Sequence, residues 1–182
     1  ALRSRLKLML RAEHPEIFQE QTWPWQEEGV IYTTEEGRDR MQAQLEHIRD
    51  EEIPAVAKQI GEAASHGDLS ENSEWTAALE KRDQLASRAT TLEGELKQAR
   101  TIGWDMAGSD FVNIGTRVTA RDQQSGEEIT YTFLGPWEAD SEHNVLNYRA
   151  PLALAFMGKR VGETVTHGEG PDARSFEILA IS

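Results

Sequence analysis

His66-Gly67-Asp68-Leu69-Ser70-Glu71-Asn72 is a short polar turn between two long segments with helical periodicity, and this arrangement decides how the chain folds. After the turn, residues recur at alternating spacings of three and four, as in the a/d seam of a coiled coil. These residues are Trp75, Ala78, Arg82, Leu85, Ala89, Leu92, Leu96 and Ala99. The matching stripe before the turn is Met41, Leu45, Ile48, Ile53, Val56, Ile60 and Ala63. The short connection predicts an antiparallel helical hairpin.

The two helices of this hairpin are expected over about residues 33–65 and 70–100. Pro54 should bend the first helix, because proline lacks a backbone donor. Each helix covers roughly 30 residues, which at about 1.5 Å per residue gives a rod on the order of 45 Å long. A rod of that length, with two carboxylates at its end, suggests that the tip is delivered into a narrow place.

After Thr101 the pattern becomes that of strands. Residues 116–121 and 128–134 are rich in β-branched and aromatic side chains, and Gln124-Ser125-Gly126 between them predicts a β-hairpin. We also expect strands at 145–148 and 176–181. A short helix is expected at 151–157, with proline in its first turn and Gly158 as its stop.

The fold class is therefore α+β, with an N-terminal antiparallel α-helical coiled-coil hairpin followed by a small α+β domain. We expect an N-terminal appendage over residues 1–30, the hairpin domain over 31–102 and the small domain over 110–182. Because the chain opens on Ala1 and not on methionine, we expect it to be a fragment of a longer protein.

Composition narrows the function class. The formal net charge of −13 and the pI of about 4.8 argue against a general binder of duplex DNA, because phosphate neutralisation requires a basic face. The charge suits a partner with a positive surface or a Mg²⁺ site, although solubility alone would also explain it. With no cysteine, no signal peptide and no apolar run near the roughly 20 residues of a membrane span, we expect a cytoplasmic protein without a membrane partner.

The tip offers two interpretations. Asp68 and Glu71 lie three residues apart, so their carboxylates could share a hard cation such as Mg²⁺, completed by ligands from another molecule. The same residues fit a helix-capping box, which is the commoner meaning of this spacing. Leu69 favours a partner contact, because an exposed apolar side chain has little structural purpose there. His66 could act as an acid or base, or simply be solvated.

Two sets of motifs resemble a known family. The first set is Gly61-Glu62-Ala63, His66-Gly67-Asp68-Leu69, Glu71-Asn72, Glu74, Trp75 and Ala77-Ala78. The second set is Gly115-Thr116-Arg117-Val118-Thr119, Ser125-Gly126-Glu127-Glu128, Thr130-Tyr131, Glu138-Ala139-Asp140, Pro151-Leu152-Ala153, Gly158-Lys159 and Gly162-Glu163. From about residue 31 to residue 182 the chain resembles the Gre transcript-cleavage factors, GreA more closely than GreB.

This resemblance implies a coiled-coil hairpin and an FKBP-like domain that docks on bacterial RNA polymerase at the secondary channel. Asp68 and Glu71 fall on the tip acids of the family, which help to hold the second Mg²⁺ while the polymerase hydrolyses its own backtracked RNA. The implied tip contacts are His66, Gly67, Leu69, Ser70 and Asn72. The implied polymerase-docking residues are Asp140, Arg149, Pro151, Leu152 and Phe156. The protein would then activate hydrolysis by the polymerase without being an enzyme, and it would use the Mg²⁺ of the polymerase and no cofactor of its own. It would contact the RNA 3′ end only indirectly and would not bind a specific DNA sequence.

Three departures from the family pattern leave alternatives open. Ala64 and Leu79 stand where the family often has arginine, and Arg149 stands where it commonly has Asn or Asp. A second hypothesis is therefore a regulator that occupies the same channel without promoting cleavage. A third is a structural coiled-coil adaptor with a capped tip. Basic residues along the rod alternate with acids, so helical pairing explains most of them without RNA.

Overall fold

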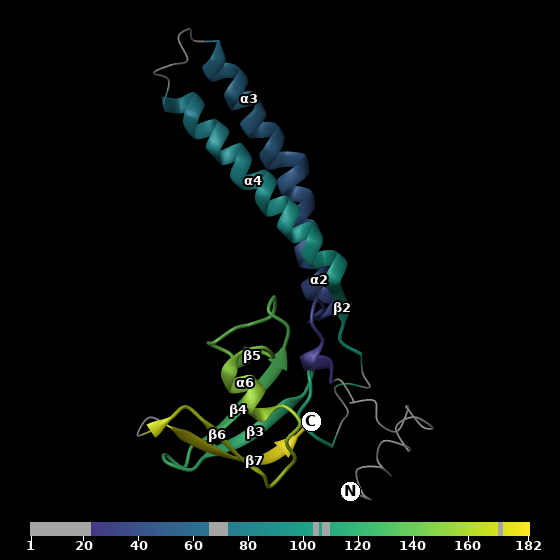
Figure 1. Cartoon of the computed structure of the whole chain (residues 1–182), viewed down its shortest axis with the longest axis vertical. Helices are drawn as coiled ribbons and strands as arrows, with labels where there is room; N and C mark the ends of the chain where they lie inside the picture. Colours follow the sequence, from purple (N-terminus) through teal and green to yellow (C-terminus); the bar gives the residue numbers. More distant parts are fainter. Residues whose placement is uncertain (1–22, 66–72, 104–105, 107–109, 171–172) are drawn as a thin grey trace, which may run out of the picture.

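A computed structural model describes residues 23–65, 73–103, 106, 110–170 and 173–182. It consists of a long helical hairpin that projects from a small domain built on a mixed five-stranded sheet (Figure 1). Each part has its own core of buried apolar side chains. The predicted α+β fold class is confirmed.

The hairpin consists of α2 (Glu35–His47), the π-helical turn η3 (Ile48–Glu52), α3 (Ile53–Ala64) and α4 (Ser73–Gln98). α3 and α4 lie side by side over the outer half of the rod (Figure 1). The predicted seam forms its core. Its buried members are Leu45, Ile48, Val56, Ala63, Ala78, Leu85, Ala89 and Leu92, with Met41, Ile53, Ile60 and Leu96 packed against them.

The prediction that Arg82 belongs to the seam is wrong. Its side chain is exposed, and its guanidinium donates hydrogen bonds to the carboxylate of Asp83 at 3.0 and 2.8 Å. A guanidinium in the apolar seam would lose its hydration, so the long side chain turns outward to solvent. The spacing of the seam residues alone does not show whether such a side chain is buried or turned toward solvent.

The first helix is interrupted before Pro54. The seam residues Ile48 and Ile53 are five positions apart, whereas an α-helical seam alternates three and four. The π turn of η3 absorbs the extra residue, and the backbone N–H of Ile53 donates to the carbonyl of Ile48. Pro54 then lies in the first turn of α3, where its missing donor costs little. The predicted distortion at Pro54 therefore takes the form of a π turn.

The hairpin ends in a small sheet that the sequence did not predict. α4 ends at Gln98 and not at Arg100, and β2 (Ala99–Thr101) pairs in parallel with β1 (Ile31–Thr33). All three residues of β1 are buried. The side chain of Thr34 then caps α2, because its hydroxyl accepts a hydrogen bond from the N–H of Gly37 at 2.9 Å.

The small domain has the strand order β5-β4-β3-β7-β6. Its elements are β3 (Arg117–Asp122), β4 (Glu128–Leu134), β5 (Val145–Asn147), α6 (Pro151–Phe156), β6 (Thr164–His167) and β7 (Arg174–Ile181). β4 and β5 are parallel, and the other pairs are antiparallel. The predicted β-hairpin, short helix and last strand are confirmed. β6 was missed because it is a four-residue edge strand with little apolar content.

Residues 23–30, here called the N-terminal strap, pack on this domain. The rings of Trp23 and Trp25 stack with centroids 5.1 Å apart, and both meet the ring of Phe111 edge-on. Trp25 also covers Gly158, whose added Cβ would lie 3.6 Å from the indole. The carboxylate of Glu27 accepts hydrogen bonds from the Tyr32 hydroxyl at 3.2 Å and from Arg100 at 3.1 Å. The strap therefore links the sheet domain to the base of the hairpin.

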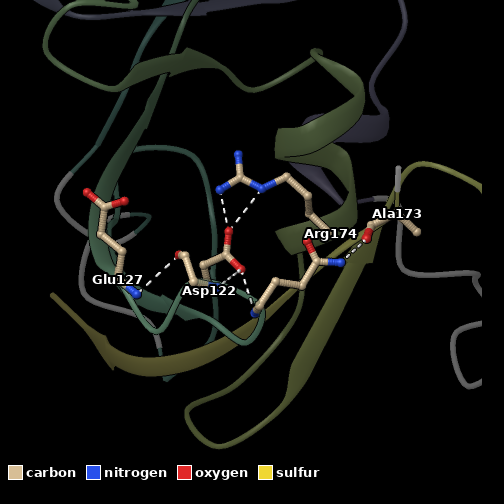
Figure 2. A network of polar contacts seen from close by, with 6 residues as sticks. Asp122, Glu127, Ala173 and Arg174 are labelled. Carbon is tan, nitrogen blue, oxygen red and sulfur yellow. Dashed lines mark hydrogen bonds and ion pairs between the residues drawn. The ribbon is translucent and has the colours of Figure 1, made fainter. Parts of the chain in front are cut away.

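A polar network closes the turn between β3 and β4 (Figure 2). The side chain of Asp122 is 2% exposed and accepts hydrogen bonds from the guanidinium of Arg174 in β7. Its other oxygen accepts from the N–H groups of Gln124, at 2.8 Å, and Ser125, at 3.3 Å. These contacts fix the turn that the sequence predicted, in which Gly126 adopts a φ of 76°.

Candidate functional site

The tip residues Asp68 and Glu71, together with His66, Gly67, Leu69, Ser70 and Asn72, lie outside the described residues. The structure does describe the two helix ends that flank them. α3 ends at Ala64 and α4 begins at Ser73, both at the end of the rod far from the sheet (Figure 1). The Ser65 hydroxyl donates to the carbonyl of Glu62 at 2.7 Å, which satisfies one carbonyl of the last turn.

A shallow groove lies between these helix ends, which places them close together. Its lining residues are Gln59, Glu62, Ala63, Glu74, Ala77, Ala78 and Lys81. Ala63 and Ala78 form its buried floor, and their small side chains allow the two helices to approach closely. The two helix ends on either side of residues 66–72 are therefore close neighbours.

Charged pairs stabilise the surface of the rod. Arg49 on η3 contacts Glu93 on α4 at 2.5 Å, and Lys97 contacts the same carboxylate at 3.1 Å. Hydrogen bonds from Lys97 and then Arg49 lower the pKa of Glu93. Lys58 pairs with Glu62 at 3.6 Å. The prediction that helical pairing engages basic residues of the rod is confirmed for Lys58 and Lys97, whereas Arg49 bridges the two helices.

Asp140 is the first of the expected docking residues. It is exposed in the loop between β4 and β5, and it pairs through its backbone with Val145. Its carboxylate contacts the ring nitrogen Nδ1 of His143 at 2.7 Å and accepts from the N–H of Glu142 at 2.9 Å. The hydrogen bond with His143 is the main cause that lowers the pKa of Asp140. This arrangement holds a carboxylate charge at the surface.

Arg149, Pro151 and Leu152 lie together at the start of α6. Arg149 is exposed, its guanidinium donates to the carbonyl of Val30 in the strap, and it lies 5.3 Å from the ring centroid of Tyr148. Pro151 is exposed at the first turn of α6, whereas Leu152 packs partly against the core. A groove joins α6 to the strap. Its lining residues are Trp25, Gln26, Glu27, Glu28, Gly29, Arg149 and Leu154.

The sequence did not predict this groove, because nothing in the strap residues reveals which part of α6 they meet. Leu154 in the groove is 46% exposed, a high value for a large apolar side chain. Arg149 lines the same groove, where its guanidinium is exposed to solvent and also bonded to the carbonyl of Val30.

Phe156, which the resemblance placed among the docking residues, is a core residue in the structure. Its side chain is fully buried, and its ring lies 5.6 to 5.8 Å from the ring centroids of Phe133, Phe176 and Tyr131. Helical periodicity explains the difference, because residues 152, 153 and 156 turn toward the sheet while residues 151 and 154 face outward. Phe156 therefore belongs to the core of the sheet domain, and its side chain is not exposed to a partner.

Two features are absent from the described residues. Among these residues no group of three or more His, Cys, Asp or Glu side chains is placed to hold a metal ion. In the same part of the chain, no helix combines the length and apolar character needed to cross a bilayer.

Comparisons with known proteins identify the relatives of this chain. Residues 31–101 match the family described as "Transcription elongation factor, N-terminal", and residues 107–182 match "Transcription elongation factor, GreA/GreB, C-term". A "Transcription elongation factor GreA" of Paracoccus denitrificans is 41% identical over 154 residues, covering 83% of this chain and 96% of that protein. One of Chlamydia trachomatis is 37% identical over 158 residues, which are 87% of this chain and 22% of that longer protein.

Among solved structures, a crystal structure of the GreA factor homolog 1 (Gfh1) protein of Thermus thermophilus is similar to this chain. It is 24% identical, its TM-score is 0.39, and the match covers 84% of this chain and 99% of that chain.

Proposed function

This chain belongs to the GreA/GreB family of transcription elongation factors, and we propose that it binds bacterial RNA polymerase at the secondary channel and stimulates cleavage of backtracked nascent RNA. In this proposal the hairpin enters the channel while the sheet domain stays at its entrance. The protein acts in the cytoplasm, contacts the RNA 3′ end only indirectly and needs no sequence-specific DNA.

The rod is the observation that supports this proposal. α4 alone has 26 residues, which at about 1.5 Å per residue is roughly 39 Å of helix. The end of α3 and the start of α4 lie at the far end of this rod, away from the sheet (Figure 1). A stiff extension of this kind can place Asp68 and Glu71 deep inside another molecule, at a low cost in conformational entropy.

The two tip carboxylates fit part of a Mg²⁺ site. Mg²⁺ takes one or two protein carboxylates as hard oxygen ligands and fills its other positions with water or other groups. Asp68 and Glu71 would complete the coordination of a Mg²⁺ ion of the polymerase, and such an ion supplies an acidified water and stabilises a leaving oxygen. The chain contributes two negative charges and their orientation, so it is an activator of hydrolysis by the polymerase and not an enzyme itself.

We place the docking surface at the start of α6 and the loop before β5. Asp140, Arg149 and Pro151 are exposed there, and Leu152 is partly so. Asp140 and Arg149 present charges of opposite sign, which favours one orientation of a partner over the reverse. Leu154 in the strap groove is a neighbouring apolar contact.

The test uses stalled RNA polymerase complexes that are backtracked by several nucleotides and carry RNA labelled at its 5′ end. Added protein should shorten the RNA in a concentration-dependent way, and it should bind the same complexes in a competition assay. Binding without any shortening would reject cleavage stimulation and favour a regulator that only occupies the channel. Absence of binding would reject the polymerase as partner and favour the coiled-coil adaptor.

A further inference from the structure

Glu138 of the sheet domain reaches the first residues of the hairpin. It lies in the loop after β4, and its Oε1 accepts hydrogen bonds from three donors at the entry to α2. The Thr33 hydroxyl lies 2.5 Å away, and the N–H and hydroxyl of Thr34 each lie 3.1 Å away. Since Thr34 caps α2, the carboxylate lies at the positive end of that helix, where a negative charge is favoured.

Two glycines leave the space that this contact needs. A Cβ added to Gly37 would lie 1.8 Å from Oε1 of Glu138, and one added to Gly135 would lie 2.0 Å from the carbonyl oxygen of Tyr32. Both distances are far below van der Waals contact. The side chain of Glu138 therefore packs directly on Gly37 at the start of α2, and Gly135 packs on the backbone of Tyr32 in β1.

A second contact joins the same loop to α2, and one oxygen of Glu138 is buried without a partner among the described residues. Arg40 in α2 donates to the carbonyl of Trp137 at 2.5 Å, so the residue beside Glu138 is also held to the hairpin. The second oxygen of Glu138, Oε2, is buried, and among the described residues it has no hydrogen-bond partner. A buried acceptor without a partner is costly, and it persists only where the other contacts of the group compensate for it.

We infer that Glu138 is a positioning residue that sets the direction of the hairpin relative to the sheet domain. Tyr32 of β1 belongs to the core of the sheet domain, whereas the helices of the hairpin have a separate core, so neither core alone fixes the angle between the helices and the sheet. Glu138 supplies a directional link, because three donors of Thr33 and Thr34, at the junction of β1 and α2, converge on one oxygen. Under the proposed function, on which the use of this direction rests, the link aims the tip.

The experiment measures the angle directly and without a polymerase. The chain has no cysteine, so a Ser87→Cys, Ala180→Cys pair carries spin labels on α4 and β7 only. Both positions are exposed. Pulsed electron resonance then gives the distribution of distances between the two elements. We expect one narrow distribution in the parent protein. In Glu138→Ala the distribution should be shifted or about twofold broader, because the hairpin can then rotate about its base.

Two further variants sharpen the test. Gly37→Ala should broaden the distribution in the same way, because its methyl group displaces Oε1. Glu142→Gln removes one charge from an exposed position of the same loop and should leave the distribution unchanged. Circular dichroism should report wild-type helix and sheet content in all variants, because both cores remain.

An unchanged distribution in Glu138→Ala and Gly37→Ala would overturn the inference and leave the proposed function untouched. Complete unfolding of either variant would also contradict it, because the inference assigns Glu138 to orientation and not to a core. Conversely, a broadened distribution in Glu138→Ala, together with a parent protein that does not stimulate RNA cleavage, would support the positioning role and reject the proposed function.

Discussion

The carboxylate of Asp122 is nearly inaccessible to solvent, yet it remains charged because three groups donate to it. The hydrogen bond from Arg174 is the main cause that lowers its pKa, and the N–H of Gln124 adds to the effect. The same pairing raises the pKa of Arg174. Because the folded-state pKa of Asp122 lies below the unfolded one, the stabilisation is complete above the ordinary pKa of about 3.9 and is lost as the pH falls through the folded value.

We therefore expect Asp122→Asn to lower the thermal unfolding midpoint of the sheet domain at neutral pH, because its amide NH₂ opposes the donors of Arg174. The difference from wild type should shrink as the pH falls below about 4, because the unfolded wild-type chain then takes up a proton at Asp122 that the folded protein binds only at lower pH. Thermal unfolding followed by circular dichroism at a series of pH values measures both effects. A constant difference down to the lowest pH would contradict this role of the charge.

Phe156 gives a second prediction at this scale. Phe156→Ala should cost about 3 to 5 kcal/mol of unfolding free energy, as expected when a fully buried aromatic ring is removed. The matched control Leu154→Ala, on the exposed side of α6, should change stability by less than about 0.5 kcal/mol. Denaturant titration measures both. A stable Phe156→Ala protein that has lost only its partner binding would return Phe156 to the docking surface.

At the scale of elements, the π turn explains how an irregular seam still packs. Ile48 and Ile53 are five residues apart, and the wider turn of η3 brings both toward α4. The turn also places Pro54 where no α-helical hydrogen bond is required of it. The proline therefore marks the start of a new helix and not a defect in a continuous one.

Pro54→Ala should consequently change the unfolding free energy by less than about 1 kcal/mol, compared with the roughly 3 kcal/mol that a proline costs inside a helix. Ala57→Pro, at an exposed position farther along α3, is the control and should show the larger loss. Chemical denaturation of the two variants measures this difference. A gain of several kcal/mol in Pro54→Ala would show that the proline strains the hairpin.

The elements also show what the sequence can and cannot predict. Periodicity identified the seam and the β3–β4 hairpin, because each depends on neighbours close in sequence. It did not reveal the pairing of β1 with β2 or the packing of Trp25 on Gly158, which join residues far apart in the chain. Arg82 and Phe156 were misplaced because residue spacing gives a face but not the final position of a side chain.

At the scale of the whole molecule, the hairpin that carries the tip and the domain expected to bind the polymerase are separate parts. The outer ends of α3 and α4 lie far from the sheet domain, which carries the expected docking residues on α6 and in the loop before β5 (Figure 1). The strap and Glu138 connect the two parts at the base of the hairpin. This separation allows the tip acids to be changed without disturbing attachment, which makes the central claim directly testable.

The most direct measurement is the rate of RNA shortening in backtracked complexes with the Asp68→Asn, Glu71→Gln double variant at saturating concentration. These substitutions keep side-chain size and remove both anionic ligands. The account predicts a loss of stimulation on the order of 100-fold, while the variant still displaces wild-type protein from the complexes. Full stimulation by the double variant would contradict the claim that the tip carboxylates act at the metal site of the polymerase.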